Sequence, residues 1–204
     1  MTTPRWKEQG RRLARPLVLT LDRLGVTPDT VTVAGLLLSW VAAWLLARGA
    51  LAGGALVLAA GSLLDMLDGG LARLQGTSSA RGAFLDSNVD RLSEAAVYAG
   101  LAWQFTAPGA VHRAAVLWCV LALGGSLCTS YARARAEGLG RECRGGWLQR
   151  PERMIALIAA LLLGRPVLVP VLAVLAAGTW LTTFQRIVAV SRDMGREPPG
   201  GDGA

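Results

Sequence analysis

Residues 166–185 read PVLVPVLAVLAAGTWLTTFQ, a run of 20 positions without a charged side chain. A helix rises about 1.5 Å per residue, so this run would be about 30 Å long, which is the thickness of the hydrocarbon core of a bilayer. Three other uncharged runs are similar: 18 residues at 30–47, 17 at 95–111 and 19 at 114–132. Surface helices of a soluble bundle need a polar face. Four such runs therefore indicate a polytopic membrane protein.

Two shorter uncharged runs complete the pattern. Ala50–Leu64 is 15 residues long and ends at Asp65, and Met154–Gly164 is 11 residues long and follows Arg153. We therefore predict an all-α fold with six transmembrane helices. Their approximate ranges are 30–49, 51–74, 83–105, 112–136, 150–164 and 166–191.

The segment before the first span has its own pattern. Leucines at 13, 17, 21 and 24 recur at helical spacing, and the arginines lie off that face. This spacing predicts an N-terminal amphipathic helix that lies in the membrane interface. Thr27 and Pro28 then supply the chemistry of a helix start. The expected organisation is an arm at 1–29, a transmembrane domain at 30–191 and a disordered tail at 192–204.

The net charge of +7 is unevenly distributed along the six predicted spans. Seventeen of the 21 Lys and Arg residues fall on the side that holds both termini, and Arg48, Arg113 and Arg165 fall on the other. Positive charge accumulates on the cytoplasmic side of membrane proteins. We therefore expect a protein of the cell membrane with both termini in the cytoplasm. Its basic face suits anionic lipid and phosphorylated substrates, and nucleic acid is not expected as a partner.

Four aspartates lie where a helix facing lipid would not tolerate them. Asp68 comes three positions after Asp65, and Asp90 four positions after Asp86, so each pair shares one helix face. A turn near 75–82 joins the two helices. All four carboxylates can thus converge just inside the cytoplasmic boundary, and the active site is expected there.

Carboxylates crowded at that depth would repel one another and lose hydration, so they require a cationic partner. Two divalent ions would neutralise the set, and oxygen ligands favour a hard cation such as Mg²⁺ or Mn²⁺. Paired metal ions recur in enzymes that catalyse displacement at phosphorus. The small residues Gly69 and Gly70 leave room for a phosphate ester, and Arg73 suits a phosphate oxygen.

The acidic segment follows the pattern D-x2-D-G-x2-A-R-x8-G-x3-D-x3-D, which resembles the signature of the CDP-alcohol phosphotransferases. Its eight fixed positions are Asp65, Asp68, Gly69, Ala72, Arg73, Gly82, Asp86 and Asp90. The resemblance implies a six-helix membrane enzyme, usually a homodimer. Such an enzyme transfers a substituted phosphate from a CDP-linked lipid to an alcohol and releases CMP.

The resemblance also implies roles for individual residues. Asp65, Asp68 and Asp86 would bind metal, and Asp90 would both contact metal and accept the proton of the acceptor hydroxyl. The residues implied for the CDP-lipid are Pro28, Asp29, Thr30, Val31, Gly69, Arg73 and Ser79.

A second basic cluster bears on the acceptor. Its members end the fourth span, open the fifth and end the sixth, and they are Ser130, Arg133, Arg150, Arg153 and Arg186. We expect them to face the same cytoplasmic cavity as the aspartates and to bind a phosphate of the acceptor. Each arginine taken singly is also explained by the charge asymmetry of the membrane.

The segments LDMLDGGLAR, SYARARAEGLG and RPERM are similar to those of the actinobacterial type of phosphatidylinositol-phosphate synthase. That resemblance implies CDP-diacylglycerol as donor and inositol 1-phosphate as acceptor. Phosphatidylglycerol-phosphate synthase is the nearest alternative, since glycerol 3-phosphate would also need a basic pocket. A divalent-cation transporter and a basic membrane scaffold are alternatives from other classes.

Overall fold

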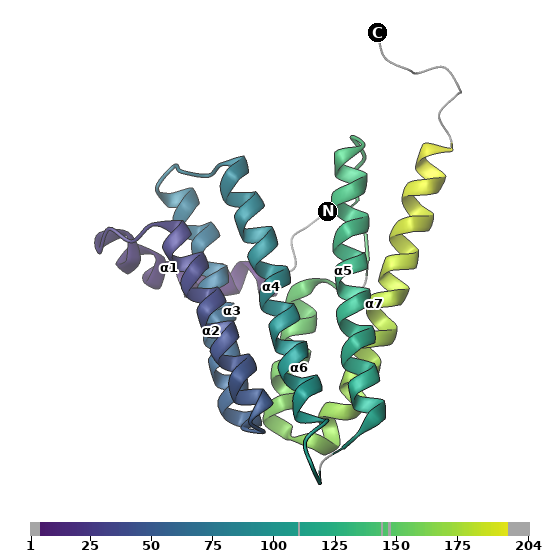
Figure 1. The fold of residues 1–204 in the computed structure, drawn as a ribbon. Helices are drawn as coiled ribbons and strands as arrows, with labels where there is room; N and C mark the ends of the chain where they lie inside the picture. Colours follow the sequence, from purple (N-terminus) through teal and green to yellow (C-terminus); the bar gives the residue numbers. More distant parts are fainter. Residues whose placement is uncertain (1–4, 110, 144, 147, 196–204) are drawn as a thin grey trace. The chain divides into compact units, whose positions relative to one another are not determined.

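The computed structural model describes residues 5–109, 111–143, 145–146 and 148–195, with side chains from residue 14 onward. This part of the chain is helical and contains no strand, which confirms the all-α class (Figure 1). The helices are α1 (Arg5–Arg23), α2 (Pro28–Ala47), α3 (Leu51–Leu74), α4 (Ala80–Gln104), α5 (Arg113–Gly138), α6 (Arg150–Leu163) and α7 (Arg165–Met194). Each of the six predicted spans coincides with one of the helices α2 to α7.

The chain divides into two compact units, an N-terminal unit that ends at Gly100 and a C-terminal unit that begins at Leu101. In the N-terminal unit α2 and α3 lie side by side and α1 runs across them (Figure 1). A Cβ on Gly61 of α3 would lie only 3.2 Å from the carbonyl oxygen of Gly35 on α2. The two glycines therefore allow the backbones of α2 and α3 to approach closely.

The beginning of α2 has the cap and the proline that the sequence predicts for a helix start. Thr27 caps the helix, because its hydroxyl accepts a hydrogen bond from the N–H of Thr30 at 3.3 Å. Pro28 occupies the first turn, where its missing N–H costs nothing. The predicted helix start is confirmed.

Helix α1 is attached to α3 by small and branched side chains. Ala14 and Val18 are buried against Leu67 and Leu71. On the predicted leucine face, Leu17 is 46% exposed and Leu24 71% exposed, whereas Leu21 is partly buried. Helix α1 thus carries apolar side chains on two sides, one against α3 and one outward.

In the C-terminal unit α5 and α7 pack against each other in parallel. Two buried hydroxyls join them, since Thr129 Oγ1 lies 2.7 Å from Thr183 Oγ1. The indole N–H of Trp180 donates to the carbonyl of Leu121 at 3.1 Å. Helix α6 packs against α7, and residues 139–149 connect α5 to α6.

Four helices of the described residues, α2, α3, α5 and α7, are long and apolar enough to cross a membrane. Large apolar side chains point outward along α2, where Leu37, Trp40 and Trp44 are each more than half exposed. Surfaces of this kind mark contact with a membrane or a partner rather than with water. The chain is therefore a helical membrane protein.

Two of the six predicted spans do not meet the same criterion. Helix α4 carries Asp86, Asp90, Arg91 and Glu94 within its length. Helix α6 has 14 residues and is about 21 Å long, shorter than the hydrocarbon core. Helix α7 continues through Met194, so the expected tail begins with helical residues; residues 196–204 of that tail lie outside the described part.

Candidate functional site

Three of the four predicted aspartates come together in the N-terminal unit. Asp65 and Asp68 on α3 and Asp86 on α4 each offer a carboxylate oxygen, and these oxygens lie within 4.8 Å of one another. Asp68 is 5% exposed, and the other two are half-buried. The residues between α3 and α4 form a short turn, so an aspartate near the end of α3 can meet one near the start of α4.

Asp68 is held by hydrogen bonds to both carboxylate oxygens. The hydroxyl of Thr32 on α2 donates to Oδ2 at 2.6 Å, and the backbone N–H of Gly69 donates to Oδ1. Thr32 is itself 6% exposed. These donors fix the plane of a carboxylate that is largely shielded from water.

Asp90 lies one helical turn after Asp86 but is not a member of the close group. Its Oδ2 lies 3.6 Å from a guanidinium nitrogen of Arg91, and its side chain is 13% exposed. The same nitrogen of Arg91 donates to the carbonyl of Ser87. Asp90 is therefore placed beside the cluster, next to a positive charge.

The residues of the cluster fit a divalent metal ion. The donor set consists of carboxylate oxygens alone, which are ligands of Mg²⁺ and Mn²⁺ rather than of softer metals. Three carboxylates within 4.8 Å also concentrate negative charge in a poorly hydrated place. A hard cation would relieve that repulsion.

The residues expected to bind the CDP-lipid surround the ends of three helices. Pro28, Asp29, Thr30 and Val31 form the first turn of α2. At the end of α3, a Cβ on Gly69 would lie 3.4 Å from Nη1 of Arg73, so the guanidinium extends over the glycine. Helix N-termini carry partial positive charge and bind phosphate groups.

The beginning of α4 is joined to this region by polar contacts. Ser79 precedes the helix, and its hydroxyl accepts the N–H of Gly82 at 3.1 Å, as a helix cap does. Arg81 Nη1 forms an ion pair with Asp29 Oδ2 at 3.0 Å. Sequence reasoning missed this role of Arg81, because the residue registered only as one of many positive charges on that face.

The five residues expected to bind the acceptor belong to the C-terminal unit. Ser130 is half-buried on α5, and Arg150 is the first residue of α6. Arg133 is exposed, and its Nε donates to Glu137 Oε1 at 2.8 Å.

Two of these arginines are deeply buried. Arg153 is 2% exposed, and it donates to Ser126 Oγ at 2.8 Å and to the carbonyl of Leu148 at 3.2 Å. Arg186 is 7% exposed, and it donates to the carbonyls of Gly145 at 2.8 Å and Thr129 at 2.7 Å. Both side chains thereby bind the connection between α5 and α6.

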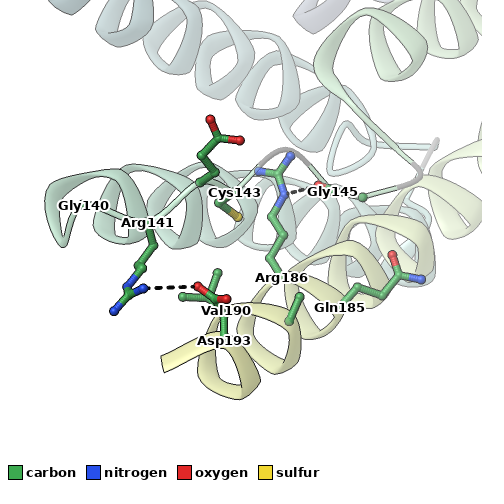
Figure 2. A pocket seen from close by; sticks show the side chains of 11 residues that line it. Gly140, Arg141, Cys143, Gly145, Gln185, Arg186, Val190 and Asp193 are labelled. Carbon is green, nitrogen blue, oxygen red and sulfur yellow. Dashed lines mark hydrogen bonds and ion pairs between the residues drawn. The ribbon is translucent and has the colours of Figure 1, made fainter. Parts of the chain in front are cut away.

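A pocket of about 630 Å³ opens beside Arg186, between that connection and the last turns of α7 (Figure 2). Figure 2 shows the Arg186 side chain extending from α7 toward Gly145. At the edge of the pocket Arg141 Nη1 lies 3.6 Å from Asp193 Oδ2. Arg186 is thus the member of the predicted acceptor set that lines this pocket.

Comparison with known proteins adds independent findings. Residues 25–185 match the family model of the CDP-alcohol phosphatidyltransferases. The chain is 39% identical over 196 residues to the phosphatidylinositol phosphate synthase of Mycolicibacterium smegmatis, with 92% of this chain and 88% of that protein covered. It is 38% identical to the archaetidylinositol phosphate synthase of Methanothermobacter thermautotrophicus, with 88% of this chain and 89% of that protein covered.

Solved structures of similar proteins also match the fold of this chain. The crystal structure of Mycobacterium tuberculosis phosphatidylinositol phosphate synthase with CDP-DAG bound matches with a TM-score of 0.82 and 34% identity, over 95% of this chain and 98% of that one. The structure of the same synthase with manganese and citrate matches with a TM-score of 0.81 and 34% identity, over 93% of this chain and 92% of that one.

Proposed function

The chain belongs to the CDP-alcohol phosphatidyltransferase family, and from that premise we propose that it transfers the phosphatidyl group of CDP-diacylglycerol to inositol 1-phosphate. The products are phosphatidylinositol phosphate and CMP. The observation that carries the proposal is the meeting of Asp65, Asp68 and Asp86 within 4.8 Å, in a chain whose relatives over nearly its whole length include phosphatidylinositol phosphate synthases. The enzyme type is therefore a phosphatidylinositol phosphate synthase.

The donor binds, in this proposal, at the helix ends of the N-terminal unit. Gly69 lets the backbone approach the nucleotide, and Arg73 and the start of α2 provide positive charge for its phosphates. Ser79 and the segment Pro28–Val31 complete the set. The related synthase solved with CDP-DAG bound supports this donor.

Asp65, Asp68, Asp86 and Asp90 would hold two divalent ions, Mg²⁺ or Mn²⁺. The carboxylate-only donor set supports this, as does the related synthase solved with manganese. When bound, the metal neutralises phosphate oxygens at the reacting centre.

Asp90 acts as the general base in the proposed reaction. Its carboxylate takes the proton of an inositol hydroxyl, whose oxygen then forms a bond to the lipid-bearing phosphorus. The bond from that phosphorus to the CMP oxygen breaks, and Arg73 stabilises the negative charge of the departing CMP. The position of Asp90 beside the three clustered aspartates supports this role.

The acceptor phosphate would be bound by Ser130, Arg133, Arg150, Arg153 and Arg186. Arginine is suited to this because its planar guanidinium can form paired hydrogen bonds with a phosphate. The pocket beside Arg186 supports a polar ligand at this end of α7.

The membrane arrangement follows from the helices. We propose six spans, α2 to α7, with both termini and the active site on the cytoplasmic side of the cell membrane. Helix α1 lies in the interface and presents Leu17 to the lipid, as does the turn that follows the helix with Leu24. The enzyme acts as a homodimer, as the family resemblance implies.

The decisive experiment is a panel of acceptors. The purified protein in lipid nanodiscs is given CDP-diacylglycerol, Mg²⁺ and one of inositol 1-phosphate, inositol, glycerol 3-phosphate or serine, and the release of CMP is measured. We expect release with inositol 1-phosphate. Turnover with glycerol 3-phosphate alone would contradict the proposed acceptor. Mg²⁺ uptake into vesicles, without release of CMP from CDP-diacylglycerol in the presence of any acceptor, would indicate a transporter instead.

A further inference from the structure

A buried hydrogen bond connects α2 to the aspartate cluster. The hydroxyl of Thr32 lies 2.6 Å from Oδ2 of Asp68, and both residues are more than nine-tenths buried. The two positions are 36 residues apart in the chain. The bond therefore exists because α2 and α3 pack together, with Gly35 and Gly61 at their close approach.

The hydroxyl of Thr32 has two possible acceptors. A threonine within a helix commonly donates to the carbonyl four residues earlier, and here the Pro28 carbonyl oxygen lies 3.1 Å away. A hydroxyl has one proton, and a bond to an ionised carboxylate is both shorter and stronger than one to a neutral carbonyl. The 2.6 Å distance to Asp68 marks the carboxylate as the acceptor.

This bond leaves Asp68 oriented but still able to coordinate. One oxygen accepts a hydrogen bond from the hydroxyl of Thr32, and the other accepts a hydrogen bond from the backbone N–H of Gly69. An ionised carboxylate has about four lone-pair positions, so each oxygen retains one for a cation. The two donors thus select the rotamer of Asp68 without using up its capacity as a ligand.

We propose that Thr32 is a positioning residue for the metal site, which orients Asp68 toward the divalent cation that Asp65 and Asp86 share. The inference rests on the proposed function to the extent that these aspartates bind metal. Groups that hydrogen-bond to metal ligands typically change metal affinity by about tenfold to a hundredfold when they are removed. Thr32 acts through Asp68 and does not touch the cation.

The test is a measurement of Mn²⁺ binding by the full chain in nanodiscs. The free Mn²⁺ is quantified from its electron paramagnetic resonance signal. Thr32→Val keeps the shape of the side chain and removes the hydroxyl, and we expect it to weaken Mn²⁺ binding by about tenfold or more. Thr32→Ser restores the hydroxyl, and we expect an affinity within about threefold of the wild type. Rescue by serine distinguishes orientation of Asp68 from packing of the γ-methyl group.

Ser39→Ala is the matched control. Ser39 lies on the same helix and is buried, but its hydroxyl donates to the carbonyl of Gly35 within α2 at 3.0 Å. We expect its Mn²⁺ affinity to equal that of the wild type. If Thr32→Val does not fold, Thr32→Ala gives the same comparison.

Three outcomes would overturn the proposal: wild-type affinity in Thr32→Val, an equal loss in Ser39→Ala, or no Mn²⁺ binding by the wild type. Failure of the proposed function has a different signature. In that case the wild type releases no CMP with any acceptor, while Mn²⁺ binding still differs between the wild type and Thr32→Val.

Discussion

The side-chain amide of Gln75 donates one hydrogen bond to Asp22 Oδ1 in the last turn of α1, at 3.0 Å, and one to the carbonyl of Val26 in the connection between α1 and α2, at 3.1 Å. Gln75 is also the C-cap residue of α3, directly after the last helical residue. One side chain therefore attaches the turn before α2 to the end of the helix that carries Asp65 and Asp68. Helix α2 begins two residues after Val26, at the segment proposed to bind the nucleotide.

Gln75→Leu should weaken binding of the lipid donor more than it slows the reaction. Leucine keeps the bulk of the side chain but leaves the turn without its donor, so the first turn of α2 loses its fixed position. A hydrogen bond of this kind contributes about 1 kcal/mol, so the KM for CDP-diacylglycerol should rise about fivefold while kcat changes by less than about twofold. Steady-state kinetics of CMP release measure both.

The control for Gln75 is Thr20→Ala. The hydroxyl of Thr20 is exposed and donates to the carbonyl of Pro16 within α1 at 3.0 Å. We expect the KM of this variant to be unchanged. A fall in kcat alone in Gln75→Leu would show that the residue does not position the donor.

Asp90→Asn separates base catalysis from metal binding. The amide cannot accept the acceptor proton, and loss of a general base typically slows turnover by about a hundredfold to ten-thousandfold. Asp90 lies outside the group of oxygens within 4.8 Å, whereas Asp86 belongs to it. Mn²⁺ affinity should therefore fall less in Asp90→Asn than in Asp86→Asn. An equal loss of Mn²⁺ affinity in both variants would contradict this prediction, because Asp90 would then contribute as much to metal binding as Asp86 does.

Gly100→Ala should destabilise the N-terminal unit. A Cβ at Gly100 on α4 would collide with the backbone carbonyl of Ala43 on α2, which cannot move like a flexible side chain. Forced overpacking of this kind costs about 1–3 kcal/mol. The measurement is the midpoint of thermal unfolding in detergent.

Gly138→Ala is the matched control, because nothing lies within 4 Å of the position of its Cβ and it too is helical. Alanine is the better helix former by up to about 1 kcal/mol. The unfolding midpoint of this variant should stay the same or rise. Equal destabilisation by both substitutions would contradict the close contact between α4 and α2.

Sequence patterns could predict the helices and much of the cluster. The charge-free runs predicted spans at 30–49 and 51–74, and helices α2 and α3 cover Pro28–Ala47 and Leu51–Leu74. The spacing of Asp65 and Asp68 and the short turn before Asp86 were enough to predict that these residues meet. Both inferences depend on helical periodicity and short loops, which are local properties of the chain.

Contacts between distant segments could not be predicted in this way. Thr32 reaches Asp68 only because α2 and α3 are in close register, and Gln75 reaches Val26 across 49 residues. Buried arginines present a related problem. Arg186 carries the same charge whether it binds backbone carbonyls or a phosphate, so its position in the sequence cannot distinguish these partners.

Arg186→Lys tests which of these partners matters. Lysine keeps the positive charge but loses the planar fork that reaches both Gly145 and Thr129. A buried carbonyl without its donor costs about 1–3 kcal/mol, so the unfolding midpoint should fall.

If Arg186 also helps to bind the acceptor, the KM for inositol 1-phosphate should rise about tenfold while the KM for CDP-diacylglycerol stays constant. Arg192→Lys, at an exposed position on the same helix, should change neither quantity. Lower stability with an unchanged acceptor KM would restrict Arg186 to holding the connection between α5 and α6.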